Sequence, residues 1–420
     1  MPKIALINVK YSPNLGDGII AECLEREIAR LSGDAQVGSI DLAGRTGFGS
    51  GLDKRRGTVL AVLGMLPARL RSMATGLAIR ALIALRYRKT WRERLEGVDH
   101  AILGGGQLLA DADLNFPLKI NAALREVGRR EIPLAVYGVG VAEELSRPAR
   151  KLFTGAFGST RLSYVAVRDQ KSKANWSAHF GALGAMEPRL CSDPGLLCRD
   201  AFPFSRPSRG ERPSVIGLGI TAPRTLKLHS AGGTHLSGHE DAAVFWIALC
   251  KELRARGHEV VLFSNGPADD EALVDEIHAV TRDTGTRRAA RPLVPGDLAE
   301  TIAGLDGVVA HRLHSNIIAY SYRIPNVALR WDRKVEAFMA AVHRDRFVAN
   351  ATAGNASLAA VMIEEAMKLG VDPNWHRQVL EGARSSIGKC LEALTAGRIA
   401  AEEGPASELE NAFGASPAAH

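Results

Sequence analysis

Cysteine is scarce in this sequence, with five residues in 420, and long apolar runs are missing. The cysteines are scattered and odd in number, and none stands in the paired short spacing of a zinc site or a redox motif. No run of about 18 apolar residues occurs, because Pro67, Arg69 and Arg71 interrupt the most apolar stretch. The first apolar run begins at Ile4, without the length or cleavage site of a signal peptide. We therefore expect a cytoplasmic protein without a spanning helix.

Acidic residues are nearly absent from residues 51–97. Eleven lysines and arginines between Asp53 and Glu96 are opposed only by Asp53, Glu93 and Glu96, and this segment accounts for the net charge of +7. Such an excess favours anionic partners, among them acidic membrane surfaces and phosphorylated substrates. Leucines and valines share the segment, so it suits an interfacial helix that would bring the protein to the inner face of the membrane. Amphipathic helices packed on the first domain are the alternative. We expect no nucleic acid partner, and the oligomeric state stays open.

Short β-branched or apolar runs alternate with longer helical patterns. This order predicts parallel sheets with helices on both faces. The predicted strands are residues 4–8, 37–41, 100–103, 134–137, 164–167, 215–220, 260–264, 307–310 and 326–329.

The domain division follows from proline. Residues 200–214 contain three prolines and read as a linker that extends neither helix nor strand. We predict an N-terminal Rossmann-like domain over 1–199, with the basic insert at about 51–97, and a second over 215–372. A C-terminal helix is predicted over 373–400, and a mobile tail over 401–420.

Glycine-rich loops follow two predicted strands of the first domain. Neither Gly104-Gly105-Gly106 nor Gly138-Val139-Gly140 completes the dinucleotide fingerprint, which disfavours a dehydrogenase. The first run would let the backbone approach a ligand closely. The loop from Asn14 to Gly18 is predicted to turn into a helix near Ile19, whose amides could meet an anion. The alternative is an ordinary turn with Asp17 as the helix N-cap.

Basic residues follow two further strands. Arg168 stands at the end of one, before Asp169, which is placed to cap the next helix. A surface salt bridge is the alternative role for Arg168. His311-Arg312-Leu313-His314-Ser315 follows another, where a helix would direct its positive dipole end outward. Arg312 supplies a two-pronged donor for carboxylate or phosphate, and His314 supplies a proton carrier. The histidine pair could also bind metal, but a third ligand is not evident, so we expect no metal and a structural role for His311.

Several short motifs, taken in order, resemble the polysaccharide pyruvyltransferase family. The resemblance spans about residues 3–340 and rests on Asn14-Leu15-Gly16-Asp17, Leu103 to Gly106, Val167-Arg168-Asp169, Ser192-Asp193-Pro194, Arg312-Leu313-His314, and Arg330 to Val335. It implies two Rossmann-like doubly wound domains facing a central cleft, a fold like that of GT-B glycosyltransferases. It also implies transfer of a pyruvyl group from phosphoenolpyruvate to a pair of sugar hydroxyls, in a polysaccharide or its lipid-linked precursor, with release of phosphate and without a cofactor.

The resemblance also assigns residues. Arg168 and Arg312 would hold phosphoenolpyruvate, and His314 would carry protons. The residues implied in donor or acceptor binding are Asn14, Gly16, Asp17, Gly104, Gly105, Gly106, Arg224, Ser315, Asp332 and Lys334. Family members often have an arginine directly after the strand at 215–220, whereas here Thr221-Ala222-Pro223 precedes Arg224.

Two other functions remain open at this point. One is a nucleotide-sugar glycosyltransferase of the same fold, although its ribose-binding carboxylates are not evident. The other is a non-catalytic carbohydrate-binding protein. Residues 224–240, rich in glycine and histidine, are predicted to form a mobile cover over the ligand, with histidines that could orient sugar hydroxyls. Solvated histidines without such a role are the alternative.

Overall fold

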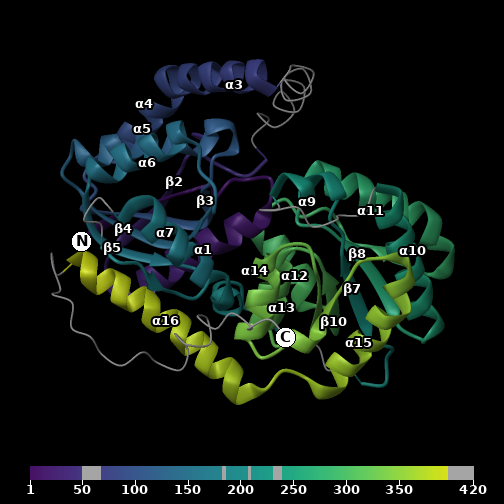
Figure 1. Cartoon of the computed structure of the whole chain (residues 1–420). Helices are drawn as coiled ribbons and strands as arrows, with labels where there is room; N and C mark the ends of the chain where they lie inside the picture. The colour runs from purple at the N-terminus through teal and green to yellow at the C-terminus, as the bar shows by residue number, and fades with distance from the viewer. Residues whose placement is uncertain (50–67, 182–185, 207–209, 230–238, 396–420) are drawn as a thin grey trace. The chain divides into compact units, whose positions relative to one another are not determined.

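The computed structural model describes residues 1–49, 68–181, 186–206, 210–229 and 239–395. It divides the chain into two compact units (Figure 1). Of the residues described, unit 1 comprises those of Met1–Ser12, Ile20–Pro194 and 383–395, and unit 2 comprises those of Pro13–Ile19 and Gly195–Gly382. Each unit contains one parallel sheet with helices packed on it.

The sheet of unit 1 has six parallel strands in the order β2-β1-β3-β4-β5-β6. Its central strands are apolar on both faces, as expected where helices cover both sides. The strand bounds are β1 (Lys3–Asn8), β2 (Gln36–Asp41), β3 (His100–Leu109), β4 (Pro133–Val141), β5 (Arg161–Val167) and β6 (Arg189–Leu190).

One face of this sheet is covered by helices that bury the aromatic core. Phe153, Phe157, Trp176 and Phe180 pack together there, and α5 packs against α3, α4 and α6. The helices of unit 1 are α1 (Leu15–Ser32), α3 (Ala68–Leu82), the π-helix η1 (Ile83–Tyr87), α4 (Arg88–Arg94), η2 (Ala112–Leu114), α5 (Asn115–Gly128), α6 (Arg147–Gly158) and α7 (Gln170–Phe180).

Unit 2 also has a sheet of six parallel strands, in the order β12-β11-β10-β7-β8-β9. The strands are β7 (Val215–Gly219), β8 (Glu259–Phe263), β9 (Arg287–Arg288), β10 (Gly307–Ala310), β11 (Asn326–Leu329) and β12 (Val348–Ala349).

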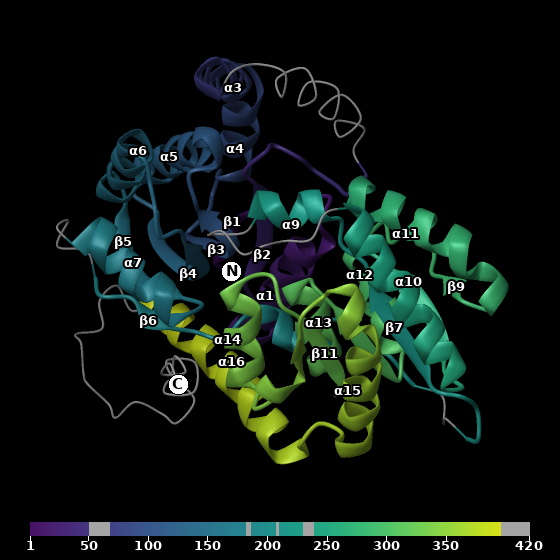
Figure 2. The ribbon, with the colours of Figure 1, turned by 45° about the vertical axis from the view of Figure 1, so that its right-hand side comes forward.

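Its helices form two layers (Figure 2). α10 packs against α11 and α15, and α13 packs against α12 and α14. The helices are η4 (Pro194–Leu197), α8 (Cys198–Ala201), α9 (Pro223–His229), α10 (His239–Ala255), α11 (Ala268–Thr281), η5 (Arg282–Thr284), α12 (Pro295–Ala303), α13 (Leu313–Ser321), α14 (Arg333–Ala341), η6 (Asp345–Phe347), η7 (Ala353–Asn355) and α15 (Ala356–Leu369).

The long C-terminal helix α16 (Pro373–Thr395) belongs to both units. Its residues up to Gly382 cluster with unit 2, and those from Ala383 cluster with unit 1. In the second part Ile387, Cys390 and Leu394 are buried, and Ser386 Oγ lies 2.6 Å from Tyr137 Oη of β4. The first unit is therefore completed by the end of the described chain.

Each of the nine predicted strands is present, some with extended bounds. The strands that the sequence did not reveal, β6, β9 and β12, have two residues each and lie at sheet edges. The predicted helix start near Ile19 is wrong, because α1 begins at Leu15 and Asp17 lies inside its first turn. The predicted tail at 401–420 lies outside the described residues. Among the helices described, none is long and apolar enough to cross a bilayer.

Candidate active site

The order of strands in unit 2 reverses between β7 and β10. From β7 the chain proceeds to β8 and β9 on one side, and from β10 it proceeds to β11 and β12 on the other. In doubly wound sheets, ligands bind at the carboxyl ends of the strands beside such a reversal. The loops after β7 and β10 are therefore the place to look for a site in this unit.

Three buried polar side chains occupy equivalent positions at this edge. Gly219, Phe263 and Ala310 end their strands in register with one another. Two residues beyond each end stand Thr221, Asn265 and Arg312, whose exposed fractions are 1%, 0% and 8%. Thr221 Oγ1, Asn265 Nδ2 and Arg312 Nε have no hydrogen-bond partner among the residues described. Each atom can donate a hydrogen bond, so the edge is suited to a ligand with several acceptor oxygens.

Arg312 is fixed at one end by a buried carboxylate. Its Nη2 donates to Asp270 Oδ2, and Asp270 is fully buried in the first turn of α11. The other oxygen of Asp270 accepts from Ala222 N at 2.9 Å and from Thr225 Oγ1 at 3.3 Å. Asp270 therefore joins the loop after β7, the start of α9 and the guanidinium of Arg312.

His314 lies in the first turn of α13, which begins directly after Arg312. A Cβ on Gly16 would come within 2.5 Å of His314 Nδ1, so the first turn of α1 packs closely against the imidazole. The same turn is held by Leu15 N, which donates to Asn265 O at 3.0 Å. Ser315 Oγ donates to Asn265 Oδ1 at 2.7 Å. Gly16, His314 and Ser315, predicted as site residues from distant parts of the sequence, are thus brought together.

The histidine before Arg312 has a different environment. His311 is 4% exposed and packs edge-on against Trp246, with ring centroids 5.4 Å apart. Burial, together with the nearby charge of Arg312, lowers the pKa of His311 to about 3. Its carbonyl accepts from Trp331 Nε1 at 2.6 Å. His311 is therefore neutral at physiological pH and part of the packing that supports the loop.

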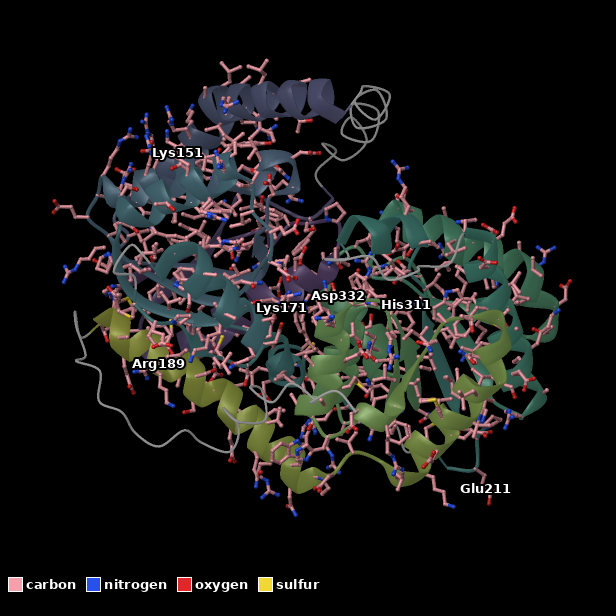
Figure 3. All side chains as sticks on the ribbon, viewed as in Figure 1. Lys151, Lys171, Arg189, Glu211, His311 and Asp332 are labelled. Carbon is pink, nitrogen blue, oxygen red and sulfur yellow. The ribbon has the colours of Figure 1, made fainter. Side chains whose placement is uncertain are left out.

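Asp332 and Lys334 lie next to this support. Asp332 caps α14, accepting from Lys334 N at 2.9 Å, and its carboxylate lies 3.3 Å from Lys334 Nζ. Lys334 Nζ also lies 4.4 Å from the centre of the Trp331 ring. Asp332 and His311 are both marked in Figure 3. Through Trp331, the predicted pair is connected to the carbonyl of His311.

In unit 1, Arg168 is held at the end of β5 with its side chain 10% exposed. Its Nη2 donates to Gln107 Oε1, and its Nε donates to Asp169 Oδ2 at 3.1 Å. A Cβ on Gly140 would come within 2.5 Å of Gln107 Oε1 and 2.6 Å of Arg168 Nη2, so a side chain there would displace the ends of these two side chains.

The prediction that Asp169 caps the next helix is confirmed, because its Oδ1 accepts from Ser172 N at 2.7 Å. Burial alone would raise the pKa of Asp169. Arg168 and the hydrogen bonds from Ser172 outweigh that effect and hold the pKa below its ordinary value.

The glycine run at 104–106 lies inside β3. Gly105 and Gly106 have positive φ angles of 81° and 78°. A Cβ on Gly105 would come within 2.6 Å of Ile20 Cγ2, and one on Gly104 within 3.1 Å of Tyr137 O. Backbone conformation and close packing therefore account for these glycines, in addition to any ligand that approaches them.

Part of the predicted cover at 224–240 is helical. Arg224 is exposed in α9, His229 ends that helix, and His239 begins α10, where its Nε2 lies 2.8 Å from Glu276 Oε2. The expectation of a continuous loop is wrong at these positions, and residues 230–238 lie outside the described chain. The N-terminal part of the basic insert, residues 50–67, also lies outside it.

A family model described as polysaccharide pyruvyl transferase matches residues 14–333. The chain belongs to this family. It is accordingly a transferase enzyme, and Asn14, Arg168, Arg312, His314 and Asp332 all fall within the matched segment. A search of curated proteins finds no match.

Solved structures show the fold of this family member to be GT-B-like. A putative UDP-N-acetylglucosamine 2-epimerase from Listeria monocytogenes has 12% identity and a TM-score of 0.55, over 96% of this chain and 99% of that one. The UDP-GlcNAc 2-epimerase from Neisseria meningitidis has 11% identity and a TM-score of 0.52, over 94% and 100%. At such identities the likeness concerns the fold alone.

Sequence reasoning missed three residues of the unit 2 edge in this pyruvyl transferase family member. Thr221 and Asn265 are polar residues directly after apolar strands, which is a signal that the sequence does contain. Asp270 is five residues further along than Asn265, in a run of acidic residues at a helix start. Nothing in the sequence distinguishes it from Asp269, its neighbour.

Proposed function

We propose that the enzyme transfers the pyruvyl group of phosphoenolpyruvate to a pair of hydroxyls on one sugar, forming a ketal and releasing phosphate. The observation that carries the proposal is the set of three buried donors, Thr221 Oγ1, Asn265 Nδ2 and Arg312 Nε, beside the strand reversal of unit 2. Donors without acceptors suit a ligand rich in anionic oxygens. Phosphoenolpyruvate carries a carboxylate and a phosphate.

The position of Arg312 supports the same donor. Arg312 stands at the N-terminus of α13, where the helix dipole favours an anion. Asp270 accepts a hydrogen bond from Nη2 of the guanidinium and leaves Nε to donate to the ligand. A planar guanidinium held in this way can form the paired hydrogen bonds that a carboxylate or phosphate accepts. We assign Arg168 a second anion-binding role on the basis of its buried, fixed guanidinium.

His314 is proposed as the proton carrier. A proton added to the methylene carbon of the donor generates an oxocarbenium-like centre, which one sugar hydroxyl attacks as it loses its own proton. The attacked carbon is the neighbour of the protonated one and carries the phosphate oxygen. Its bond to that oxygen then breaks, and phosphate leaves. The second hydroxyl attacks the same carbon, loses its proton and closes the ketal. A histidine can exchange protons in such steps at neutral pH.

The acceptor is proposed to be a sugar of a polysaccharide or of its lipid-linked precursor, met in the cytoplasm at the inner face of the membrane. The family supports a polysaccharide acceptor. Five free, buried cysteines support a reducing compartment. Asn14, Asp17, Gly104, Arg224, Asp332 and Lys334 remain proposals for donor or acceptor contacts.

The test is incubation of purified protein with phosphoenolpyruvate and a panel of glycans and lipid-linked oligosaccharides. Release of phosphate that depends on the acceptor, with the acceptor gaining pyruvate by mass spectrometry, is the expected result. Hydrolysis of phosphoenolpyruvate without acceptor dependence would contradict the proposal. Consumption of a nucleotide sugar in place of phosphoenolpyruvate would indicate a glycosyltransferase.

A further inference from the structure

The basic insert of unit 1 ends in a continuous helical segment, α3, η1 and α4, which packs on α5 (Figures 1 and 2). Its inner row consists of Ile79, Ile83, Tyr87 and Trp91, all buried and four residues apart. Trp91 Nε1 donates to Asp41 O at 3.1 Å, which anchors the row to the end of β2. The inner side of the segment is therefore already packed against the rest of unit 1.

The π-helical turn keeps that row on one side. In an α-helix a spacing of four residues drifts by about 40° at each step, because a turn takes 3.6 residues. The wider turn between Ile83 and Tyr87 reverses the drift once. Residues two positions out of step with the inner row, Leu77, Ala81, Leu85 and Lys89, must then lie on the opposite side along the whole length.

This outer row is exposed, and it is apolar up to Leu85. Leu77 is 65% exposed and Leu85 is 84% exposed, and Leu82 beside them is 43% exposed. Ala78, Ala81 and Ala84 are exposed as well. Exposed leucines scattered singly are ordinary, but here three lie on one helical segment whose other side is already packed.

Cations surround the outer row. From residue 54 to residue 92 the sequence contains no acidic residue. Arg88 and Arg92 turn toward Glu126 of α5, at 3.5 and 3.0 Å, and Lys89 Nζ lies 3.9 Å from Glu93 Oε1. Arg80 and Arg86 are exposed. The face therefore combines exposed leucines with the positive charges of Arg80 and Arg86.

We infer that this face binds an anionic lipid surface. Lysine and arginine attract acidic headgroups, and exposed leucines enter the boundary between headgroups and acyl chains. A polyanion in solution would match the cations but leave the leucines in water. A second copy docking the same face would bring like charges together. Charge complementarity and the exposed leucines together favour the lipid surface.

The experiment is flotation of the full-length protein with vesicles, without substrate, so its outcome is independent of the proposed reaction. Vesicles of phosphatidylcholine alone are compared with vesicles containing about 30% phosphatidylglycerol, at about 0.1 M and about 1 M salt. We expect recovery with the anionic vesicles only, and loss of recovery at high salt. No recovery, or equal recovery with neutral vesicles, would overturn the inference.

Two double variants locate the surface. Leu77→Ser with Leu85→Ser removes the apolar row, and Arg80→Gln with Arg86→Gln removes two cations. The second should weaken binding by about 30-fold, at about 1 kcal/mol for each cation. Thermal unfolding should be unchanged in both, because the substituted side chains are exposed.

Matched controls come from unit 2. Leu358→Ser with Leu369→Ser removes leucines that are 52% and 58% exposed, and Arg282→Gln with Arg287→Gln removes arginines that are 67% and 60% exposed. These proteins should float like the parent. Equal losses in the controls would overturn the assignment to this helix. Self-association that only the leucine variant abolishes would identify a second copy as the occupant.

Discussion

At the scale of single residues, Arg312 and His314 stand two positions apart but are fixed by different neighbours. Asp270 in the first turn of α11 holds the guanidinium of Arg312, whereas Gly16 in the first turn of α1 packs on the imidazole of His314. In the proposed function the two side chains have separate tasks, anion binding for Arg312 and proton transfer for His314. The tasks can be separated by measurement.

Arg312→Lys keeps the charge but loses the planar fork, so affinity for phosphoenolpyruvate should fall. Arg312→Ala should cost more, about 2 to 5 kcal/mol of donor binding if the contact is desolvated. His314→Gln should retain donor affinity while turnover falls by about 10² to 10⁴-fold, because a glutamine side chain cannot take up and release a proton at neutral pH. Calorimetry beside steady-state rates distinguishes the effects. Near-normal turnover of His314→Gln would exclude it as the proton carrier.

Gly16 offers a second test of His314. In Gly16→Ala the new methyl group would lie 2.5 Å from His314 Nδ1, so the imidazole must move. Because catalytic geometry tolerates little displacement, turnover should fall by about 10²-fold while the protein stays folded. Gly158→Ala, where nothing lies within 4 Å, is the control for a helical glycine. Equal rates in the two variants would show that Gly16 does not position the histidine.

His311 gives a pH dependence of stability. Burial lowers its pKa to about 3, below the unfolded value near ~6.5. The unfolded chain therefore binds the extra proton first as the pH falls, and the folded state loses stability below about pH 6.5. At pH 5 the loss is about 2 kcal/mol. Denaturant unfolding of His311→Gln, compared with the parent at pH 8 and pH 5, should show a shallower acid loss. Parallel curves would contradict this account.

At the scale of elements, the sequence predicted a strand or a helix cap wherever the residues of that element alone produce the pattern. The strand at Gly307–Ala310 was predicted with its correct bounds because a buried parallel strand is a continuous apolar run between polar turns. Arg287–Arg288 was missed because two residues at a sheet edge produce no such run. The cap at Asp169 was predictable because its partner, Ser172, is three residues away.

The site was less predictable, since its residues are connected through space. Thr221, Asn265 and Arg312 become equivalent only when β7, β8 and β10 are placed side by side in register. The order β10-β7-β8 is not contained in any local pattern. The bond from Arg312 to Asp270 spans 42 residues, and the contact of Gly16 with His314 spans almost three hundred. The order of the motifs was enough to predict His314 as a site residue, but only the fold shows that Gly16 packs against it.

Packing between elements yields a prediction for α5. A Cβ on Gly128, the last residue of α5, would come within 1.8 Å of Ser159 O, a backbone atom at the end of α6. Backbone cannot yield as a flexible side chain does, so Gly128→Ala should destabilise unit 1 by about 1 to 3 kcal/mol. Gly158→Ala, with open space around it, should stabilise by about 0.5 to 1 kcal/mol. Urea unfolding measures both, and the same sign for both would contradict the packing argument.

At the scale of the whole molecule, the chain does not finish one unit before it begins the other. Residues 13–19 cluster with unit 2 although β1 and the remainder of α1 belong to unit 1, and residues 383–395 return to unit 1. The linker predicted from prolines at 200–214 therefore cannot by itself separate two complete domains. Neither unit is encoded by a single continuous segment.

The last part of α16 should consequently stabilise unit 1, from which it is almost two hundred residues distant in sequence. Ala383, Ile387, Cys390 and Leu394 are buried at helical spacing. Ile387 is 1% exposed, so Ile387→Ala leaves a cavity and should cost unit 1 about 2 to 5 kcal/mol.

Hydrogen exchange locates the effect, because amides of a destabilised unit exchange through more frequent opening. Amides of β4 and β5 should exchange faster in Ile387→Ala, by about tenfold for each 1.4 kcal/mol, whereas those of β7 and β10 should change less. Ser385→Ala, at an exposed neighbouring position, is the matched control and should leave both sheets unchanged. If protection fell equally in β4 and β10, the two units would unfold as one cooperative body; if it fell only in β10, the assignment of this helix end to unit 1 would be wrong.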